Sequence, residues 1–479
     1  MRLSSHDAAF LYGETASGPM HGVALQVMDG APPFSEIYDF YAQRVHRVPR
    51  LRQKLAYVPF NIAHPRWVDD PDFDLSNHVK EHALAPGTTL ARAFSEAVEL
   101  SQDLLPRDRP LWLFYVLTGV PGKTLLLQMN HHAFADGAIS VAMMLALTDE
   151  AANSSLPEIA PEWSPEPIPS AFELWQEAMA EASKQTMDRM QNSVATMTEL
   201  QDLQFRAATY MARMMRPVMQ APWNVGLIGP KRKCAFWEIG LNQLKAIKTS
   251  LGGSLNDVIV TLVLEAMSRH MSEAGIDLTD QMVRIMCPVN VRDPDADPLD
   301  FSSNRVSAMF PVLPVGPMSV LDRYHAVVAE TQDIKAQDEP RTLDRLQQLQ
   351  GDTPPVAMAP TLTVGTPVDP TLPAARAPHP ILPNTFDPQA QQLGHNFTVT
   401  NVPGPAVARF VAGARIETAT GALMLSGNIG FSTVVTSYDD KLFFGLASEP
   451  RLFADIEVFR DRIAEVYDEL ATAVRDQEE

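Results

Sequence analysis

The chain has 479 residues, of which 46% are hydrophobic and 20% are charged, an ordinary balance for a globular protein with a sizeable core. Thirty-eight basic and 58 acidic side chains leave a net charge of −20, which argues against binding nucleic acid or anionic lipid by bulk charge. No apolar run is long enough for a membrane-spanning helix, Asp7 and Glu14 interrupt any apolar N-terminal signal, and two cysteines provide no disulfide framework, so we expect a soluble cytoplasmic protein.

Residues 1–153 are predicted to form a mixed α/β domain. Residues 22–28 and 123–129 have the pattern of β-strands, and residues 91–104 have helical spacing. Five prolines in residues 154–169 exclude a helix or a central strand there, so this segment is predicted to be a linker. We expect residues 154–230 to contain this linker and one long helix.

The long helix is predicted over residues 171–216. Apolar residues recur on one face of it: Phe172, Trp175, Met179, Ala182, Met190, Val194 and Met197. The simpler interpretation is a helix packed on a domain. The alternative is an amphipathic helix that faces lipid, because methionine side chains adapt to irregular apolar surroundings.

Residues 231–479 are predicted to form a second α/β domain. Strand patterns occupy residues 234–241, 282–289 and 307–313, and helical patterns occupy residues 242–251, 256–271 and 320–337. Residues 354–388 contain ten prolines and cannot be a regular element. Residues 423–436 and 441–447 predict a hairpin around Tyr438-Asp439-Asp440, followed by a closing amphipathic helix.

The segment that carries chemistry is LLLQMNHHAFADGAIS, residues 125–140. An apolar strand leads into His131 and His132, and a short turn then reaches Asp136 and Gly137 at the start of an apolar helix. Because successive side chains of a strand point to opposite faces, only one of the two histidines can face a given cavity. Three interpretations stay open on chemistry alone: a general base, a metal site without a third ligand cluster, and a histidine pair that only stabilises a turn.

The full sequence of this segment favours one of the three interpretations of the histidine pair. HHAFADG fits HHxxxDG, the motif of the CoA-dependent acyltransferase superfamily, and further blocks resemble the bacterial bifunctional wax ester synthase/diacylglycerol acyltransferases. In chain order these blocks are SSHDAAFLYGETASGPMHG with Glu14, LRQKLAYVPFNIAHPRWVDDPDFDLSNHV, Pro110-Leu111-Trp112, Asn256-Asp257, Ser303-Asn304-Arg305, and Asn401-Val402-Pro403-Gly404-Pro405 with Thr400 in place of serine. The resemblance covers nearly the whole chain.

The resemblance implies an α/β enzyme of two chloramphenicol-acetyltransferase-like domains, with mixed sheets flanked by helices and an active-site tunnel at their interface. Its implied activity is transfer of a fatty acyl group from acyl-CoA to a long-chain alcohol or diacylglycerol, with no metal and no permanently bound cofactor. Carried over, His132 is the general base and His131 supports it. Asp136 is expected to hold the loop by an ion pair, with Arg292 and Arg305 as candidate partners.

Other residues have competing interpretations. Asn256 is a candidate donor to the thioester oxyanion or simply an N-cap before a helix that begins at Asp257. Pro110, Leu111 and Trp112 suit packing beneath the histidine strand, and Glu14 is either a motif residue or a surface residue. Gly137 permits a close backbone approach or a positive φ. Lys231 and Arg232 belong to the densest basic cluster, which is either a contact for CoA phosphates or a solvated loop.

Two further functions remain as alternatives. An amide-forming condensation enzyme shares the histidine motif, and a lipid-binding or lipid-droplet surface homologue would be non-enzymatic. Residues 354–388 depart from the family pattern, which leaves the acceptor alcohol or amine open. Any peripheral contact with the inner membrane or a lipid droplet must be local and apolar because of the net negative charge, and residues 172–197 are the expected place.

Overall fold

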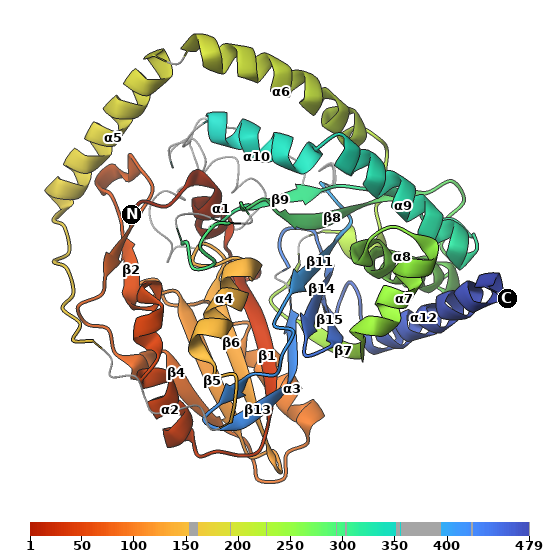
Figure 1. Cartoon of the computed structure of the whole chain (residues 1–479), viewed down its shortest axis with the longest axis horizontal. Coiled ribbons are helices and arrows are strands. Elements are labelled where there is room, and N and C mark those ends of the chain that lie inside the picture. Colours follow the sequence, from red (N-terminus) through yellow and green to blue (C-terminus); the bar gives the residue numbers. More distant parts are fainter. Residues whose placement is uncertain are drawn as a thin grey trace.

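The computed structural model describes residues 1–152, 161–191, 193–226, 228–293, 295–301, 304–350, 355, 394–422 and 425–478. Figure 1 shows two α/β lobes side by side, each built on its own sheet, with a pair of long helices passing over both. The expected α/β fold class is therefore confirmed. All but one residue of the proline-rich stretch 354–388 lies outside the described residues, so that expectation stays a prediction.

The first lobe contains a six-stranded sheet in the order β12-β13-β1-β6-β5-β4. Its strands are β1 (His21–Asp29), β4 (Val79–Ala83), β5 (Trp112–Thr118), β6 (Lys123–His131), β12 (Phe410–Val411) and β13 (Ala414–Ala422). β6 lies between β1 and β5 and runs antiparallel to both, which places His131 opposite His21. The histidine pair therefore stands at the end of a strand that is hydrogen-bonded on both sides.

Helices cover both faces of this sheet. α1 (Ser5–Gly13), α2 (Phe34–Ala42) and α4 (Gly137–Leu147) contribute to the core on one face, and α3 (Leu90–Leu100) packs on the other. A two-stranded sheet of β2 (Gln53–Ala56) and β3 (Arg66–Asp69) lies beside the first core. The predicted strands at 22–28 and 123–129 and the predicted helix at 91–104 are confirmed within a few residues.

The second lobe contains a seven-stranded sheet in the order β10-β8-β11-β14-β15-β7, with β9 paired to β8. Its strands are β7 (Lys233–Gly240), β8 (Met282–Asn290), β9 (Val306–Met309), β10 (Val312–Pro314), β11 (Phe397–Pro403), β14 (Phe431–Tyr438) and β15 (Lys441–Ser448). The predicted hairpin is confirmed as β14 and β15, whose turn residues Asp439 and Asp440 have positive φ, but residues 425–430 of its predicted first strand are not a strand. The predicted single strand at 307–313 is wrong, because the chain breaks at Phe310-Pro311 into β9 and β10.

Four helices pack with the second sheet around the largest core of the molecule: α7 (Leu241–Leu251), α8 (Leu255–Glu273), α9 (Val320–Ala336) and α12 (Ile456–Glu478). No single helix among the described residues is long and apolar enough to cross a bilayer. α7 and α8 pass that test only as a pair, bent by 99° at their junction.

The two lobes exchange part of the chain. β12 and β13 follow β11 in sequence, yet β13 pairs with β1 of the first sheet, with Val23 opposite Ala422. The predicted ranges 1–153 and 231–479 did not anticipate this exchange, because strand pairing over such a separation leaves no local pattern. The division of the chain into domains at these boundaries stays a prediction.

The long helical segment consists of two helices, α5 (Ala171–Gln191) and α6 (Ser193–Met214), which arch over the lobes in Figure 1. α6 packs on α10 (Glu339–Gln350), a helix that the sequence did not predict. The interpretation of the apolar stripe as a packed face is wrong, since Phe172, Trp175 and Met179 are exposed. The side chain of Val194 lies outside the described part of the chain.

Candidate active site

The two histidines differ in their surroundings, as the alternation of a strand predicts. His131 is fully buried, and its backbone N–H donates to the carbonyl of Leu111 over 3.0 Å. His132 is partly exposed, and its N–H donates to the carbonyl of Met20 over 2.7 Å. Backbone hydrogen bonds to both neighbouring segments thus hold the pair rigidly.

His131 is fixed by contacts at both ring nitrogens. Its Nδ1 accepts a hydrogen bond from the N–H of Ala133 over 3.0 Å, so the ring proton belongs on Nε2. Nε2 lies 3.4 Å from Oε1 of Glu14. This arrangement uses both nitrogens in holding the loop.

Glu14 is fully buried, so its interpretation as a surface residue is wrong. Oε1 accepts from the N–H of Met20 over 2.8 Å, and Oε2 accepts from the Arg107 guanidinium over 2.7 Å. Burial alone would raise the pKa of Glu14, but His131 and Arg107 outweigh it and hold the pKa well below its usual range. A carboxylate that is ionised at neutral pH therefore faces His131.

His132 presents a neutral imidazole. The ring of Phe10, from α1, stacks on it with centroids 4.3 Å apart. Burial, reinforced by His131 and His6 against the opposing charge of Asp136, lowers the pKa of His132 to about 4. Its buried Nδ1 finds no hydrogen-bond partner in another described residue. At neutral pH such a ring has a free lone pair with which to accept a proton.

Asp136 caps α4 and joins the two lobes. Its Oδ1 accepts from the N–H of Ile139 over 3.0 Å, and its Oδ2 lies 2.7 Å from Nη1 of Arg292. Arg305 contributes its backbone N–H at 3.4 Å, whereas its side chain pairs with Asp344. Of the two candidate partners, Arg292 forms the side-chain ion pair.

Gly137 follows the cap, and its small size is required by packing. A Cβ at this position would lie 3.1 Å from Cγ2 of Val402 on β11. Its φ is not positive, so the close approach and not an unusual backbone conformation accounts for glycine here.

A loop of the second lobe closes on the histidine motif. The side-chain amide of Asn304 donates to the carbonyl of His132 over 2.6 Å, and its backbone N–H donates to Oδ1 of Asp7 over 3.1 Å. Burial raises the pKa of Asp7 to about 6. The sequence analysis did not single out Asp7 or Phe10 as site residues. It named Asn304 only as part of a family block. Ser303 of that block lies outside the described residues. A family block spanning α1 was the one available signal.

Pro110, Leu111 and Trp112 lead into β5 beside the histidine strand. Leu111 and Trp112 are buried, and the Trp112 indole donates to the carbonyl of Leu51 over 2.8 Å. The Leu111 carbonyl accepts the N–H of His131, as given above. These contacts are those of a packing element that holds the end of β6.

Asn256 lies at the start of α8 rather than capping it. The helix begins at Leu255, and Ser254 is its N-cap, so the N-cap interpretation of Asn256 is wrong. Asp257 completes the capping box by accepting from Ser254 and also accepts from the Thr331 hydroxyl over 2.8 Å. Burial raises the pKa of the Cys287 thiol, and the neighbouring Asn256 side chain offsets part of that rise. Among the described residues, no hydrogen bond joins Asn256 to the histidine motif.

The residues of the basic cluster differ in their contacts, and Lys233 pairs with Glu457 over 2.7 Å. Arg232 donates to the backbone carbonyls of Gly229 and Ser17, and burial lowers its pKa to about 10. It therefore fixes a loop junction between the lobes. Lys231 is exposed to solvent.

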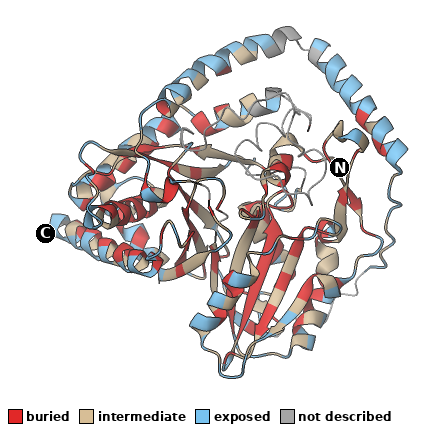
Figure 2. Ribbon diagram, turned by 180° about the vertical axis from the view of Figure 1, so that it is seen from behind, coloured by how far each residue is buried: buried red, intermediate tan, exposed pale blue. Residues whose placement is uncertain are grey.

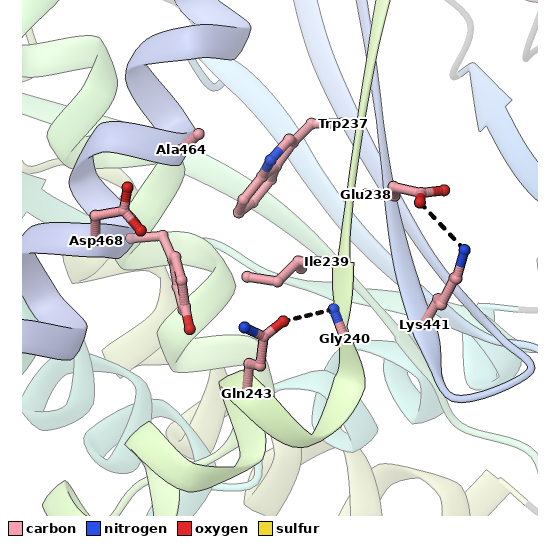
Figure 3. A pocket seen from close by; sticks show the side chains of 9 residues that line it. Trp237, Glu238, Ile239, Gly240, Gln243, Lys441, Ala464 and Asp468 are labelled. Carbon is pink, nitrogen blue, oxygen red and sulfur yellow. Dashed lines mark hydrogen bonds and ion pairs between the residues drawn. The ribbon is translucent and has the colours of Figure 1, made fainter.

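A surface cavity of about 420 Å³ lies elsewhere, at the outer edge of the second sheet. Figure 3 shows Trp237 and Asp468 at its walls, and Tyr467 also lines it. It contains none of the motif residues, so its position gives it no part in chemistry at His132. Within the described part of the chain, no group of three or more histidine, cysteine or acidic side chains is placed to hold a metal ion.

Most of this chain matches two known family models. The family model for the wax ester synthase/diacylglycerol acyltransferase catalytic domain matches residues 3–259, and the model for the corresponding C-terminal domain matches residues 302–471. A putative diacylglycerol O-acyltransferase of Mycobacterium tuberculosis is 27% identical over 100% of this chain and 91% of its own length. A probable diacylglycerol O-acyltransferase of the same organism is 26% identical over 95% of this chain and 92% of its own length.

Solved structures share the fold. The wax ester synthase/diacylglycerol acyltransferase from Marinobacter aquaeolei VT8 superposes with a TM-score of 0.67 at 18% identity, covering 99% of each chain. The starter condensation domain of rhizomide synthetase, in complex with C8-CoA, gives a TM-score of 0.60 at 13% identity, covering 98% of this chain and 94% of that one.

Proposed function

This chain belongs to the wax ester synthase/diacylglycerol acyltransferase family and is an acyl-CoA-dependent O-acyltransferase, and we propose that His132 is the general base of its reaction. The proposed acceptor is the hydroxyl of diacylglycerol or of a long-chain alcohol, giving triacylglycerols or wax esters. The names of the mycobacterial relatives support the diacylglycerol acceptor.

The observation that carries this proposal is the contrast between the two histidines. His131 has both nitrogens in contact with the protein, at Ala133 and Glu14. His132 is neutral at pH 7, is partly exposed, and is held by the Phe10 ring and by the Asn304 amide at its carbonyl. A general base must be held in place and unprotonated at the working pH, and these contacts support His132 for that role.

In the proposed step, the unprotonated ring nitrogen of His132 takes the acceptor's hydroxyl proton while that oxygen attacks the thioester carbonyl carbon. The tetrahedral intermediate then collapses, the carbon–sulfur bond breaks, and the imidazolium returns its proton to the CoA sulfur. The products are an ester and free CoA. Acyl-CoA is thus a substrate, and a CoA ligand in a condensation domain of the same fold supports a site for it here.

Glu14 and Asp136 are proposed as positioning residues, since their carboxylates contact His131 and Arg292 rather than His132. Asn256 stays a proposed oxyanion donor, a role worth about 3–4 kcal/mol for one donor. In the structure its side chain neighbours the Cys287 thiol.

The test is release of free CoA, followed with a thiol reagent, from palmitoyl-CoA with hexadecanol or a diacylglycerol. We expect release with at least one acceptor and a loss on the order of 100- to 10,000-fold in His132→Ala. Circular dichroism establishes that the variant is folded. Undiminished CoA release by folded His132→Ala would overturn the mechanism, and comparison of the two acceptors assigns the product class.

A further inference from the structure

The helices α5 and α6 present an apolar surface that nothing in the described chain covers. Most of the exposed large apolar side chains of the described residues lie between 168 and 215, and Figure 2 shows the outer sides of both helices as exposed. On α5 they are Phe172, Trp175, Met179, Met187 and Met190, and on α6 they are Met197, Phe205 and Met211. Exposed apolar surface of this extent on a folded protein marks an interaction site.

The protein holds this stripe outward. Steps of three and four residues place the α5 stripe on one side of the helix, and the residues that touch the body lie on the opposite side. These inner residues include the buried Leu174 and Ala178, and also Glu177, which pairs with Arg66 over 2.7 Å. Rotation of α5 to bury the stripe would break these contacts.

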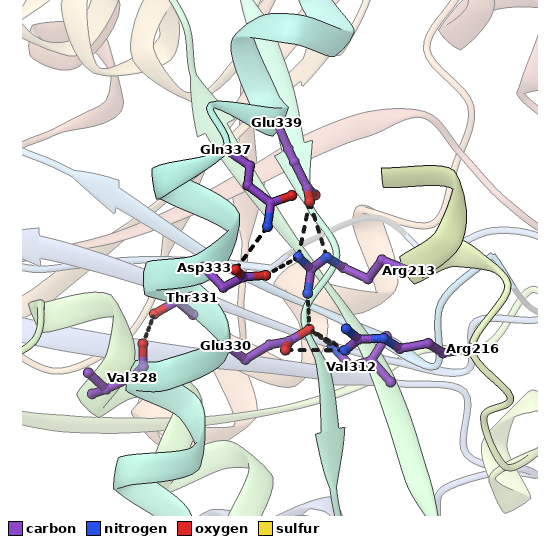
Figure 4. Close-up of polar contacts among 9 residues, drawn as sticks. All are labelled: Arg213, Arg216, Val312, Val328, Glu330, Thr331, Asp333, Gln337 and Glu339. Carbon is purple, nitrogen blue, oxygen red and sulfur yellow. Dashed lines mark hydrogen bonds and ion pairs between the residues drawn. The ribbon is translucent and has the colours of Figure 1, made fainter. Parts of the chain in front are cut away.

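The far end of the helix pair is anchored as firmly. Figure 4 shows Arg213 of α6 surrounded by acidic side chains of α9 and α10. Arg213 is buried and pairs with Glu330, with Asp333 over 2.8 Å, and with Glu339 over 3.0 Å. The helix pair is therefore fixed at both lobes, and its outer side stays available.

A second observation lies next to α5. Phe60, in the short helical turn η3 (Pro59–Asn61) that packs against α5, is 88% exposed and has φ of 60°. A bulky residue in the left-handed region carries backbone strain, and full exposure adds the cost of an unburied aromatic ring. Neither feature benefits the isolated protein, which indicates a partner for this ring.

The net charge of the chain indicates which kind of surface could bind this apolar face. A net charge of −20 opposes docking of a second copy and opposes an anionic bilayer. A surface without net charge meets no such opposition, and aromatic and methionine side chains insert well among headgroups and acyl chains. We infer that the outer face of α5, with Phe60, docks the protein on a zwitterionic phospholipid surface. The inference rests on the proposed function only in taking this surface as the source of diacylglycerol.

The primary test is flotation of the full-length protein with phosphatidylcholine vesicles. We expect the wild type to float and the variant Phe172→Ser/Trp175→Ser/Met179→Ser to lose at least about tenfold in partitioning, since each aromatic ring contributes that order of binding. The control Val407→Ser/Val458→Ser removes exposed apolar residues outside the two helices and should partition like the wild type. Phosphatidylglycerol in the vesicles should weaken binding, and added salt should restore it.

Two further measurements distinguish the outcomes. Brominated phosphatidylcholine should quench the fluorescence of the wild type, and Trp175→Phe should bind equally but lose most of that quenching. Sedimentation velocity tests self-association. The inference would be overturned if the wild-type protein did not float with vesicles. It would also be overturned if the triple substitution altered only the oligomeric state and not the vesicle binding.

The docking inference and the proposed function can be tested separately. With a dispersed short-chain alcohol as acceptor, the triple variant should release CoA at the wild-type rate, while its rate with vesicle-borne diacylglycerol should fall. Equal losses with both acceptors would mean that the stripe serves folding or catalysis and not docking. His132→Ala should float like the wild type, so loss of the chemistry leaves the docking result interpretable.

Discussion

Phe10 and His132 stack with their ring centroids 4.3 Å apart and their planes 24° from parallel. α1 brings Phe10 to one face of the imidazole, and the same helix holds the second-lobe residue Asn304 through Asp7. One short helix thus contacts both the histidine ring and the second-lobe loop that carries Asn304.

Phe10→Ala tests this link. Removal of the ring admits water to the imidazole, and because burial is the largest cause of the low pKa of His132, that pKa should rise from about 4 toward 6.5. A base must be unprotonated, so the acid limb of kcat/KM should move to higher pH, with a loss in kcat on the order of 10- to 100-fold. Phe10→Tyr keeps the stacked ring and should retain the wild-type profile. Identical pH profiles of kcat/KM for the wild type, Phe10→Ala and Phe10→Tyr would show that the stacked ring does not set the pKa of His132.

Glu14→Gln tests the buried carboxylate behind His131. The substitution leaves Arg107 buried without its ionic partner, so we expect a loss of about 3–5 kcal/mol in the free energy of unfolding, and lower kcat as His131 loosens. The folded-state pKa of Glu14 lies below its ordinary 4.5, so its stabilisation is present above that pH and is lost as the pH falls through the folded value. Urea denaturation at a series of pH values should show the difference persisting through mildly acid conditions. A difference that vanishes already near pH 6 would contradict the assignment.

Arg292→Ala and Arg305→Ala form a matched pair. Arg292 neutralises the buried Asp136 carboxylate over 2.7 Å, so its loss should cost about 3–5 kcal/mol and most of the activity. Arg305 reaches Asp136 through its backbone, and its side chain pairs with the partly exposed Asp344, so Arg305→Ala should cost about 0.2–1 kcal/mol. Denaturation midpoints and CoA release measure both. Equal effects would mean that the ion pair does not hold the loop.

Lys231→Ala tests the proposed contact with CoA phosphates. We expect the KM for acyl-CoA to rise about fivefold, which corresponds to one exposed charge contact of ~1 kcal/mol, without a change in stability. Arg232→Ala should instead destabilise the protein, because its guanidinium binds backbone carbonyls. Lys441→Ala, which removes an exposed lysine paired with Glu238, is the control and should leave KM unchanged. An unchanged KM in Lys231→Ala would remove this residue from the site.

Local pattern was sufficient where the determining contacts are local. β6, the turn and α4 are contiguous, so the strand, the turn and the helix could be predicted from a single stretch of sequence, whereas the N-cap role of Asp136 was not predicted. α10 was not predicted; its Pro340 lies in the first turn, where proline is tolerated. The apolar stripe of α5 predicted a helix but not which of its sides would face water. Periodicity shows that a helix has an apolar side, but it does not show whether that side is buried.

The contacts that complete the site are not local. Glu14 reaches His131 across the first lobe, and Asn304 reaches His132 from the other lobe. A carboxylate or an amide on its own carries no sign of a distant partner, so composition and spacing cannot distinguish such a residue from one at the surface. The family blocks marked both positions without indicating what either one touches.

The pairing of β13 with β1 has a consequence for how this chain is made. Until residues 414–422 have left the ribosome, β1 is an edge strand with unpaired backbone groups and the apolar Leu25 and Val27 beside them. The first lobe therefore completes its sheet only after β7 to β11 of the second lobe have been synthesised, and a nascent chain exposes an unpaired strand edge throughout that interval. Yield of this protein should depend on chaperone supply during translation far more than on the stability of the finished fold.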